Sequence, residues 1–154
     1  MTRCGSLSWK GIAPSPVTVL SCSDSRVPPE LVFNRSIDQL FFVRVAGNVA
    51  GPFDLASIEY AIANGYTRLI IVLGHEKCGA GRAALAAADP PTPSLVALVQ
   101  RATVRRAVET NARGSAAYIL AHSQVIRDAV QSEHVGLVVA YYNLESGVVE
   151  KISR

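Results

Sequence analysis

The sequence predicts an α/β fold in which a mostly parallel central sheet is flanked by helices and ends in an antiparallel strand at its C-terminal edge. Short β-branched and aliphatic runs alternate with segments of helical spacing along the chain. These runs are apolar at nearly every position, as in strands covered on both faces. The last two, residues 135–142 and 148–152, are separated only by a turn, which predicts a hairpin.

Local signals define the first half of the chain. Strands are predicted at residues 17–20, 40–45 and 68–73. After the first strand, Pro28 begins a short helix through Phe33, because proline is tolerated in the first turn of a helix. After the second, apolar residues three and four positions apart predict a helix over 55–62, which Asn64 and Gly65 end.

The second half is predominantly helical before the final hairpin. Residues 79–88 are rich in alanine and predict a helix, which the proline-rich segment 89–93 ends. Ser94 is expected to cap the next helix. Helical spacing continues over 95–131, and we expect two or three helices there because Gly114 weakens the middle.

Length and composition favour a globular protein. The 154 residues fit a single domain, 1–154, in which residues 1–16 form an irregular lead-in. Hydrophobic residues make up 49% and charged residues 18%, and no apolar run approaches the roughly 20 residues of a membrane span. We therefore expect no membrane contact.

Charge and cysteine usage narrow the partners and the compartment. The net charge of +3 comes from scattered basic residues, without the basic and aromatic clusters of a nucleic-acid surface. We expect no nucleic-acid partner. Three cysteines make an odd number without the spacing of a disulfide framework, and the N-terminus has no signal-peptide core. A cytoplasmic protein is the expectation.

Reactive side chains follow the first and third predicted strands. Cys22, Asp24 and Arg26 alternate directly after the first, and residues two apart in extended backbone project to the same side. His75 and Cys78 follow the third, 53 positions after Cys22. Because ligands gather beyond the carboxyl ends of parallel strands, the two groups are expected to meet. Two thiolates and an imidazole suit zinc and leave its fourth position open.

Other candidate sites lack a supporting pattern. Cys4, His122 and His134 have no partners at ligand spacing, so we expect none of them to bind metal. Gly74 and Gly79 have the spacing of a phosphate-binding loop, but the lysine and the serine or threonine that should follow are absent. An NTPase is therefore not expected.

The motifs Cys22-x-Asp24-x-Arg26 and His75-x-x-Cys78 together resemble the zinc site of the β-class carbonic anhydrases. The likeness extends through residues 44–48 and 57–61 and covers about residues 17–152. It implies one β-carbonic anhydrase-like domain and zinc-dependent, reversible hydration of CO2 to bicarbonate and a proton. It also implies a homodimer or a larger homo-oligomer.

The resemblance also assigns roles to individual residues. It implies that the zinc ligands are Cys22, His75 and Cys78, and that Asp24 and Arg26 form a dyad that switches between metal-bound and catalytic states. Substrate contacts are expected from Ala46 and Gly47, in a loop over residues 46–52 that can approach a ligand closely, and from Gly79, directly after Cys78.

Two states of Asp24 stay open. Its carboxylate can bind the metal and close the fourth position, or pair with Arg26 and accept a hydrogen bond from metal-bound water. In the second state it would orient zinc-bound hydroxide for attack on CO2. Two thiolates should leave the water less acidic than neutral ligands would, so activity is expected to rise towards alkaline pH.

Two other functions fit the same residues. One is hydrolysis of carbonyl sulfide or carbon disulfide on the same scaffold. The other is a non-catalytic zinc-bearing scaffold with Asp24 as fourth ligand. The start of the chain also departs from the family pattern: we expect the usual N-terminal helical arm to be absent, and residues 11–14 lack the glutamine of a Gly-Gln-x-Pro segment. This departure bears on substrate contact and on dimer stability.

Overall fold

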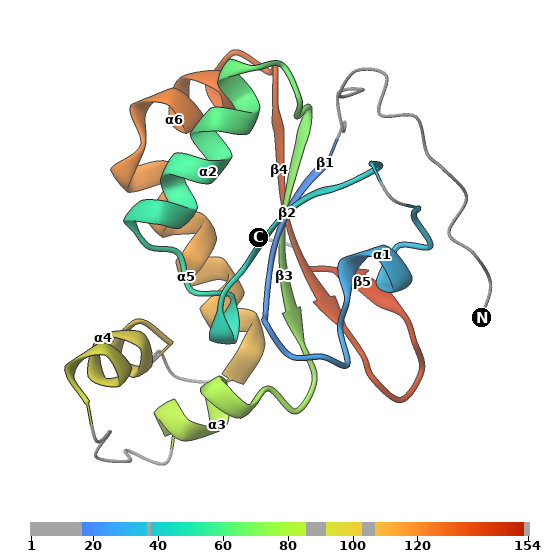
Figure 1. The fold of residues 1–154 in the computed structure, drawn as a ribbon, viewed down its shortest axis with the longest axis vertical. Coiled ribbons are helices and arrows are strands. Elements are labelled where there is room, and N and C mark those ends of the chain that lie inside the picture. Colours follow the sequence, from blue (N-terminus) through green and yellow to red (C-terminus); the bar gives the residue numbers. More distant parts are fainter. Residues whose placement is uncertain (1–16, 37, 86–91, 103–106, 153–154) are drawn as a thin grey trace, which may run out of the picture.

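A five-stranded sheet organises the protein (Figure 1). The structure is a computed structural model that describes residues 17–36, 38–85, 92–102 and 107–152. In chain order the strands are β1 (Val17–Ser21), β2 (Phe41–Arg44), β3 (Leu69–His75), β4 (Gly136–Tyr142) and β5 (Val149–Lys151). Their order in the sheet is β2-β1-β3-β4-β5. The first four are parallel to their neighbours and β5 is antiparallel to β4, which confirms the predicted fold class.

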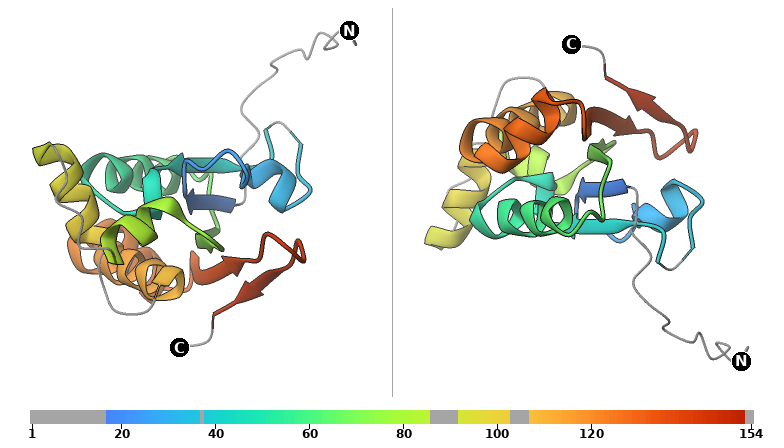
Figure 2. Two further views of the ribbon diagram at one scale, coloured as in Figure 1. Left: turned by 90° about the horizontal axis from the view of Figure 1, so that it is seen from below. Right: turned by 90° about the horizontal axis from the view of Figure 1, so that it is seen from above.

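Helices connect the parallel strands. Those described are α1 (Pro29–Val32), the short 3-10 helix η1 (Ala46–Asn48), α2 (Pro52–Ala63), α3 (Gly79–Leu85), α4 (Pro93–Ala102), α5 (Ala107–His122) and α6 (Gln124–Gln131). Helices α2, α5 and α6 lie on one side of the sheet and α1 lies on the other (Figures 1 and 2). Both faces are therefore partly covered, as the apolar strands require.

The strands divide their side chains between two apolar clusters. On β1, Leu20 packs in the larger cluster with residues of α2, α5 and α6 such as Ile58 and Ile119. Its neighbour Val19 packs in the second cluster, with Val32 of α1 against it. This alternation follows from the period of two in a strand. It leaves the carboxyl end of β1 between two packed layers, where its position is well determined.

Two predicted helix boundaries were wrong. Helix α4 begins at Pro93, and the cap is Thr92, whose side-chain oxygen accepts a hydrogen bond from the Leu95 amide at 3.3 Å. Ser94 lies inside the helix because proline suits the first helical position. The expected two or three helices over residues 95–131 are confirmed as α4, α5 and α6, but Gly114 does not interrupt α5. Helix α5 instead gives way to α6 at Ser123, whose hydroxyl accepts a hydrogen bond from the Ile126 amide at 3.1 Å and caps α6.

Some expectations fall outside the described residues. The lead-in over residues 1–16, including Cys4 and residues 11–14, lies there, as does the end of the helix predicted over residues 79–88. Within the part of the chain that the structure describes, no helix has both the length and the apolar character needed to cross a membrane.

Helix α5 approaches β3 closely at Gly74. A Cβ atom on Gly74 would lie 2.5 Å from Cγ1 of Val108 and 3.1 Å from its carbonyl oxygen. We therefore expect Gly74→Ala to lower the free energy of unfolding by about 1–3 kcal/mol, as overpacking does. The control is Gly114→Ala in α5, where a Cβ would meet nothing within 4 Å.

The control should raise stability by about 0.5–1 kcal/mol, because alanine favours a helix over glycine. Urea denaturation followed by circular dichroism measures both changes. Equal stability of the Gly74→Ala variant and the unmodified protein would contradict the close approach.

Candidate metal centre

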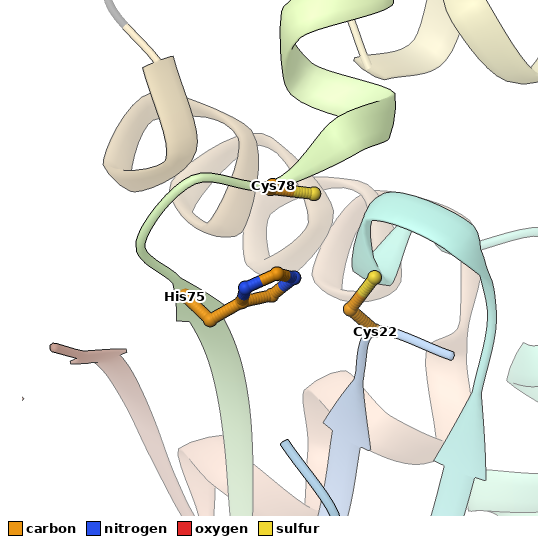
Figure 3. Close-up of side chains that lie close together, drawn as sticks. All are labelled: Cys22, His75 and Cys78. Carbon is orange, nitrogen blue, oxygen red and sulfur yellow. The ribbon is translucent and has the colours of Figure 1, made fainter. Parts of the chain in front are cut away.

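Three ligand side chains converge beyond the carboxyl ends of β1 and β3. Cys22 directly follows β1, His75 is the last residue of β3, and Cys78 directly precedes α3. Their ligand atoms all lie within 4.8 Å of one another, and all three residues are buried. Figure 3 shows the imidazole and the two sulfur atoms facing a common space. The predicted meeting of the two motifs is thus confirmed.

The His75 ring has one nitrogen free for a metal. Its Nδ1 lies 2.9 Å from the carbonyl oxygen of Glu76, which requires a proton on Nδ1. The lone pair is then on Nε2, which is buried and has no hydrogen-bond partner among the described residues. A buried acceptor without a partner is costly, and a metal ion would satisfy it.

The two thiols differ in acidity. A hydrogen bond from Cys78 holds the pKa of Cys22 well below its usual value, and burial opposes this shift. The pKa of Cys78 is raised by the same hydrogen bond and by burial. The Gly47 amide donates a further hydrogen bond to Sγ of Cys22 at 3.2 Å. Cys22 is therefore the more readily ionised thiol, and binding of a metal by both should release a proton.

Asp24 and Arg26 form a two-pronged ion pair beside these ligands. Nε of Arg26 donates to Oδ1 of Asp24 at 2.9 Å, and Nη2 donates to Oδ2 at 2.6 Å. The Arg26 amide also donates to Oδ1, at 3.0 Å. Both carboxylate oxygens are thus engaged by arginine. That Asp24 can instead ligate the metal stays a prediction.

The pair fixes the charge of the carboxylate. Hydrogen bonds from Arg26 hold the pKa of Asp24 well below its usual range, and the pKa of Arg26 is raised by the same contact. The pair's contribution to stability is present above the ordinary aspartate pKa of about 4 and is lost as the pH falls through the lowered value. Asp24 is therefore ionised throughout the neutral range.

Arg44 holds the backbone that carries Cys22 and Asp24. From the end of β2 it donates from Nε to the Cys22 carbonyl at 3.0 Å and from Nη2 to the Asp24 carbonyl at 2.7 Å. In the sequence, Arg44 belongs to the likeness over residues 44–48, and no role is predicted for it. Its position could have indicated a role, because Arg44 is a charged residue at the end of an apolar strand. That strand pairs with the strand that precedes Cys22.

Lys77 ties the metal-ligand loop to the turn between β4 and β5. Its Nζ lies 2.6 Å from Glu145 and 3.3 Å from Glu76, and its carbonyl accepts a hydrogen bond from Arg26 at 3.2 Å. A second contact joins the same segments, because the Leu144 amide donates to Glu76 at 3.1 Å. Spacing along the sequence gives no sign of this connection.

The residues expected to contact substrate occupy different settings. Gly47 lies in η1 with φ of 70°, a conformation that favours glycine, and its Cβ position is 3.0 Å from Cβ of Ala80. Ala46 precedes it, and Gly79 begins α3 at an exposed position. Substrate contact by these three residues stays a prediction.

The other described histidines lie apart from this cluster. Both are exposed; Nδ1 of His122 contacts the Tyr118 carbonyl at 3.0 Å, and Nδ1 of His134 contacts the Ser132 hydroxyl at 2.8 Å. Within the described residues, Cys22, His75 and Cys78 are the group of cysteine, histidine and acidic side chains placed to hold a metal.

Known structures share this architecture. The β-carbonic anhydrase CafA of Aspergillus fumigatus matches with a TM-score of 0.74 and 25% identity, over 92% of this chain and 77% of that one. One of two β-carbonic anhydrases from Sordaria macrospora, described as tetrameric, matches with a TM-score of 0.72 and 20% identity, over 92% and 83% of the two chains.

Sequence comparison agrees with the structural likeness. A model of the carbonic anhydrase family matches residues 17–103, and carbonic anhydrase 2 of Mycobacterium tuberculosis is 34% identical over 89% of this chain and 73% of its own length. The chain belongs to the β-carbonic anhydrase family. In this β-carbonic anhydrase the matched segment contains the whole candidate metal centre, from Cys22 to Cys78.

Proposed function

We propose that this β-carbonic anhydrase catalyses the zinc-dependent, reversible hydration of CO2 to bicarbonate and a proton. One observation carries the proposal: three ligand atoms converge, and two residues after Cys22 the Asp24 carboxylate accepts two hydrogen bonds from the Arg26 side chain. Arg26 also donates to the carbonyl of Lys77, the residue before Cys78. A purely structural metal site needs four closed ligands and has no use for such a dyad. The carbonic anhydrases that the chain resembles supply the reaction class.

The donor set fits zinc. Two thiolates and one neutral imidazole are typical zinc ligands, and three protein ligands are the number found in catalytic sites. When bound, zinc acts as a Lewis acid that lets water react as a nucleophile near neutral pH. The free Nε2 of His75 and the buried sulfur atoms of Cys22 and Cys78 would hold it.

Asp24 and Arg26 would orient the nucleophile. The carboxylate can only accept hydrogen bonds, so it would accept one from the O–H of the attacking hydroxide and turn an oxygen lone pair towards the carbon of CO2. Arg26 keeps the carboxylate anionic and fixed in direction. Formation of a C–O bond between this hydroxide and CO2 gives bicarbonate. The proton that the water lost on becoming hydroxide passes to buffer. Ala46, Gly47 and Gly79 would border the space that CO2 enters.

A homo-oligomer is part of the proposal. The Sordaria macrospora enzymes of the same fold are described as tetrameric. We infer that this chain also assembles with copies of itself, as a dimer or a larger form.

Stopped-flow measurement of CO2 hydration between pH 7 and 9, with zinc content determined on the same sample, tests the function. We expect about one zinc per chain, because three protein ligands form one catalytic zinc site. We also expect a hydration rate that rises with pH. The pKa of Asp24 lies far below this range, so the rise would come from the nucleophile and not from the carboxylate.

Full zinc occupancy without CO2 hydration at any pH would contradict the proposal. Turnover of carbonyl sulfide on that sample would then identify a hydrolase on the same scaffold. No turnover of either substrate would leave a zinc-bearing scaffold. A rate that stays flat over the pH range would contradict only the expected alkaline rise.

A further inference from the structure

A buried polar cluster connects α5 to the backbone that contacts Cys22. Asn111 and Ser115 lie one turn apart on α5, and both are buried although polar. Their side chains turn towards η1. The amide nitrogen of Asn111 donates to the Gly47 carbonyl, and the Ser115 hydroxyl donates to the Asn48 carbonyl at 2.8 Å. Two successive carbonyls of η1 are thus held by one helix.

Gly47 is anchored from both of its backbone groups. Its carbonyl is held by Asn111, and its amide donates to Sγ of Cys22 at 3.2 Å. The orientation of the Asn111 amide is fixed by chemistry, because the Gly47 carbonyl can only accept a hydrogen bond. Gly47 therefore links Asn111 of α5 to the Cys22 sulfur through two hydrogen bonds in series.

The backbone between these anchors needs support. Gly47 has φ of 70° and Asn48 has φ of 48°, so two successive residues occupy the left-handed region. Glycine adopts this region freely, but at Asn48 surrounding contacts must help to hold it. Asn111 and Ser115 supply these contacts from the buried face of α5. Without them, the Gly47 amide would no longer be aimed at Cys22.

We propose that Asn111 is a positioning residue that sets the Gly47 hydrogen bond on Cys22 and thereby tunes the metal centre. The inference rests on the metal binding in the proposed function, but not on the reaction. A hydrogen bond to a thiolate stabilises its negative charge and fixes the direction of the sulfur, so its loss leaves Sγ of Cys22 less well oriented for a metal. Residues that orient ligands in this way affect metal affinity about 10–100-fold.

The test compares Asn111→Leu with the unmodified protein. Leucine has the same branching and the same number of side-chain heavy atoms as asparagine, with bulkier methyl groups, and it cannot donate to the Gly47 carbonyl. We expect the affinity for zinc, measured by competition of the loaded protein with a chromophoric chelator, to fall by about tenfold. In the cobalt-substituted protein, the sulfur-to-cobalt charge-transfer band should move to longer wavelength, because less energy is needed to remove an electron from Cys22.

Ile119→Val is the matched control. Ile119 lies on the same helix and is fully buried, but it packs in the apolar cluster with Leu20 and Ile58. Its truncation should lower the melting temperature and leave zinc affinity and the cobalt band unchanged. A general loosening of α5 would move the melting temperature alone, whereas a role in positioning moves the cobalt band.

Asn111→Ser decides the question if the leucine variant does not fold. The serine side chain is too short to reach Gly47, and it leaves room for water. A folded variant with zinc affinity within twofold of the unmodified protein and an unshifted cobalt band would overturn the inference. If the unmodified protein binds zinc but hydrates no CO2, the proposed function fails, and the affinity and cobalt measurements still decide the role of Asn111.

Discussion

Asp24→Asn is expected to lower the rate of CO2 hydration by at least about a hundredfold, which is the lower end of what a positioned acid or base contributes. The amide has almost the shape of the carboxylate, but it has no negative charge and one of its two ends donates hydrogen bonds. The amide cannot accept hydrogen bonds from Arg26 at both of its ends. Its NH2 end also cannot accept a hydrogen bond from the attacking water. Stopped-flow hydration with zinc content on the same sample measures the effect.

Asp128→Asn provides the control for this change. Asp128 is exposed on α6, where its carboxylate accepts a hydrogen bond from Gln124, and it lies outside the metal centre. The same chemical change there should leave hydration unaltered. Unchanged hydration in a folded, zinc-loaded Asp24→Asn variant would refute the proposed mechanism. Loss of zinc from that variant would show instead that Asp24 ligates the metal.

His75→Ala should remove the metal and the activity together. The substitution deletes one of three ligands and leaves two sulfur atoms without the imidazole nitrogen. Zinc affinity should fall at least about 100-fold, because the loss of residues that only orient ligands already costs up to that much. The rate of CO2 hydration should drop to that of the uncatalysed reaction in buffer. Zinc analysis after gel filtration, together with stopped flow, measures both.

His122→Ala is the matched histidine control. His122 is exposed near the end of α5, where its ring stacks on Tyr118. Its removal should change neither zinc content nor hydration. If His75→Ala retained one zinc per chain while circular dichroism showed a native fold, the proposed ligand set would be wrong.

The sequence was sufficient to predict that the two ligand-bearing motifs lie close together in the fold. Cys22 and His75 mark the ends of two apolar runs, and parallel strands present their carboxyl ends at the same edge of a sheet. Helix boundaries were harder, because several polar residues near Pro93 can cap a helix. Only the backbone geometry shows that Thr92 does so and that Ser94 lies inside.

The support around the ligands could not be predicted in the same way. Asn111 lies 64 positions from Gly47 in the sequence, and a polar residue in a helix is usually exposed. Which turn of α5 faces η1 depends on how the helix packs over the sheet. Arg44 likewise donates to a backbone carbonyl, and the carbonyl of Lys77 accepts a hydrogen bond from Arg26. Backbone carbonyls leave no mark in a sequence pattern.

The alignment of β1 on β3 has a consequence for how the protein acquires its metal. Ser21 is paired with Leu73, so Cys22 emerges one residue beyond the paired segment. A slip of one residue would turn its side chain to the opposite face of the sheet. Pairing of β1 with β3 also closes a long loop of chain between them. Such pairing forms slowly, because conformational entropy is lost before the contacts that compensate for it form. We therefore expect zinc capture to be a late folding event that selects correctly aligned molecules.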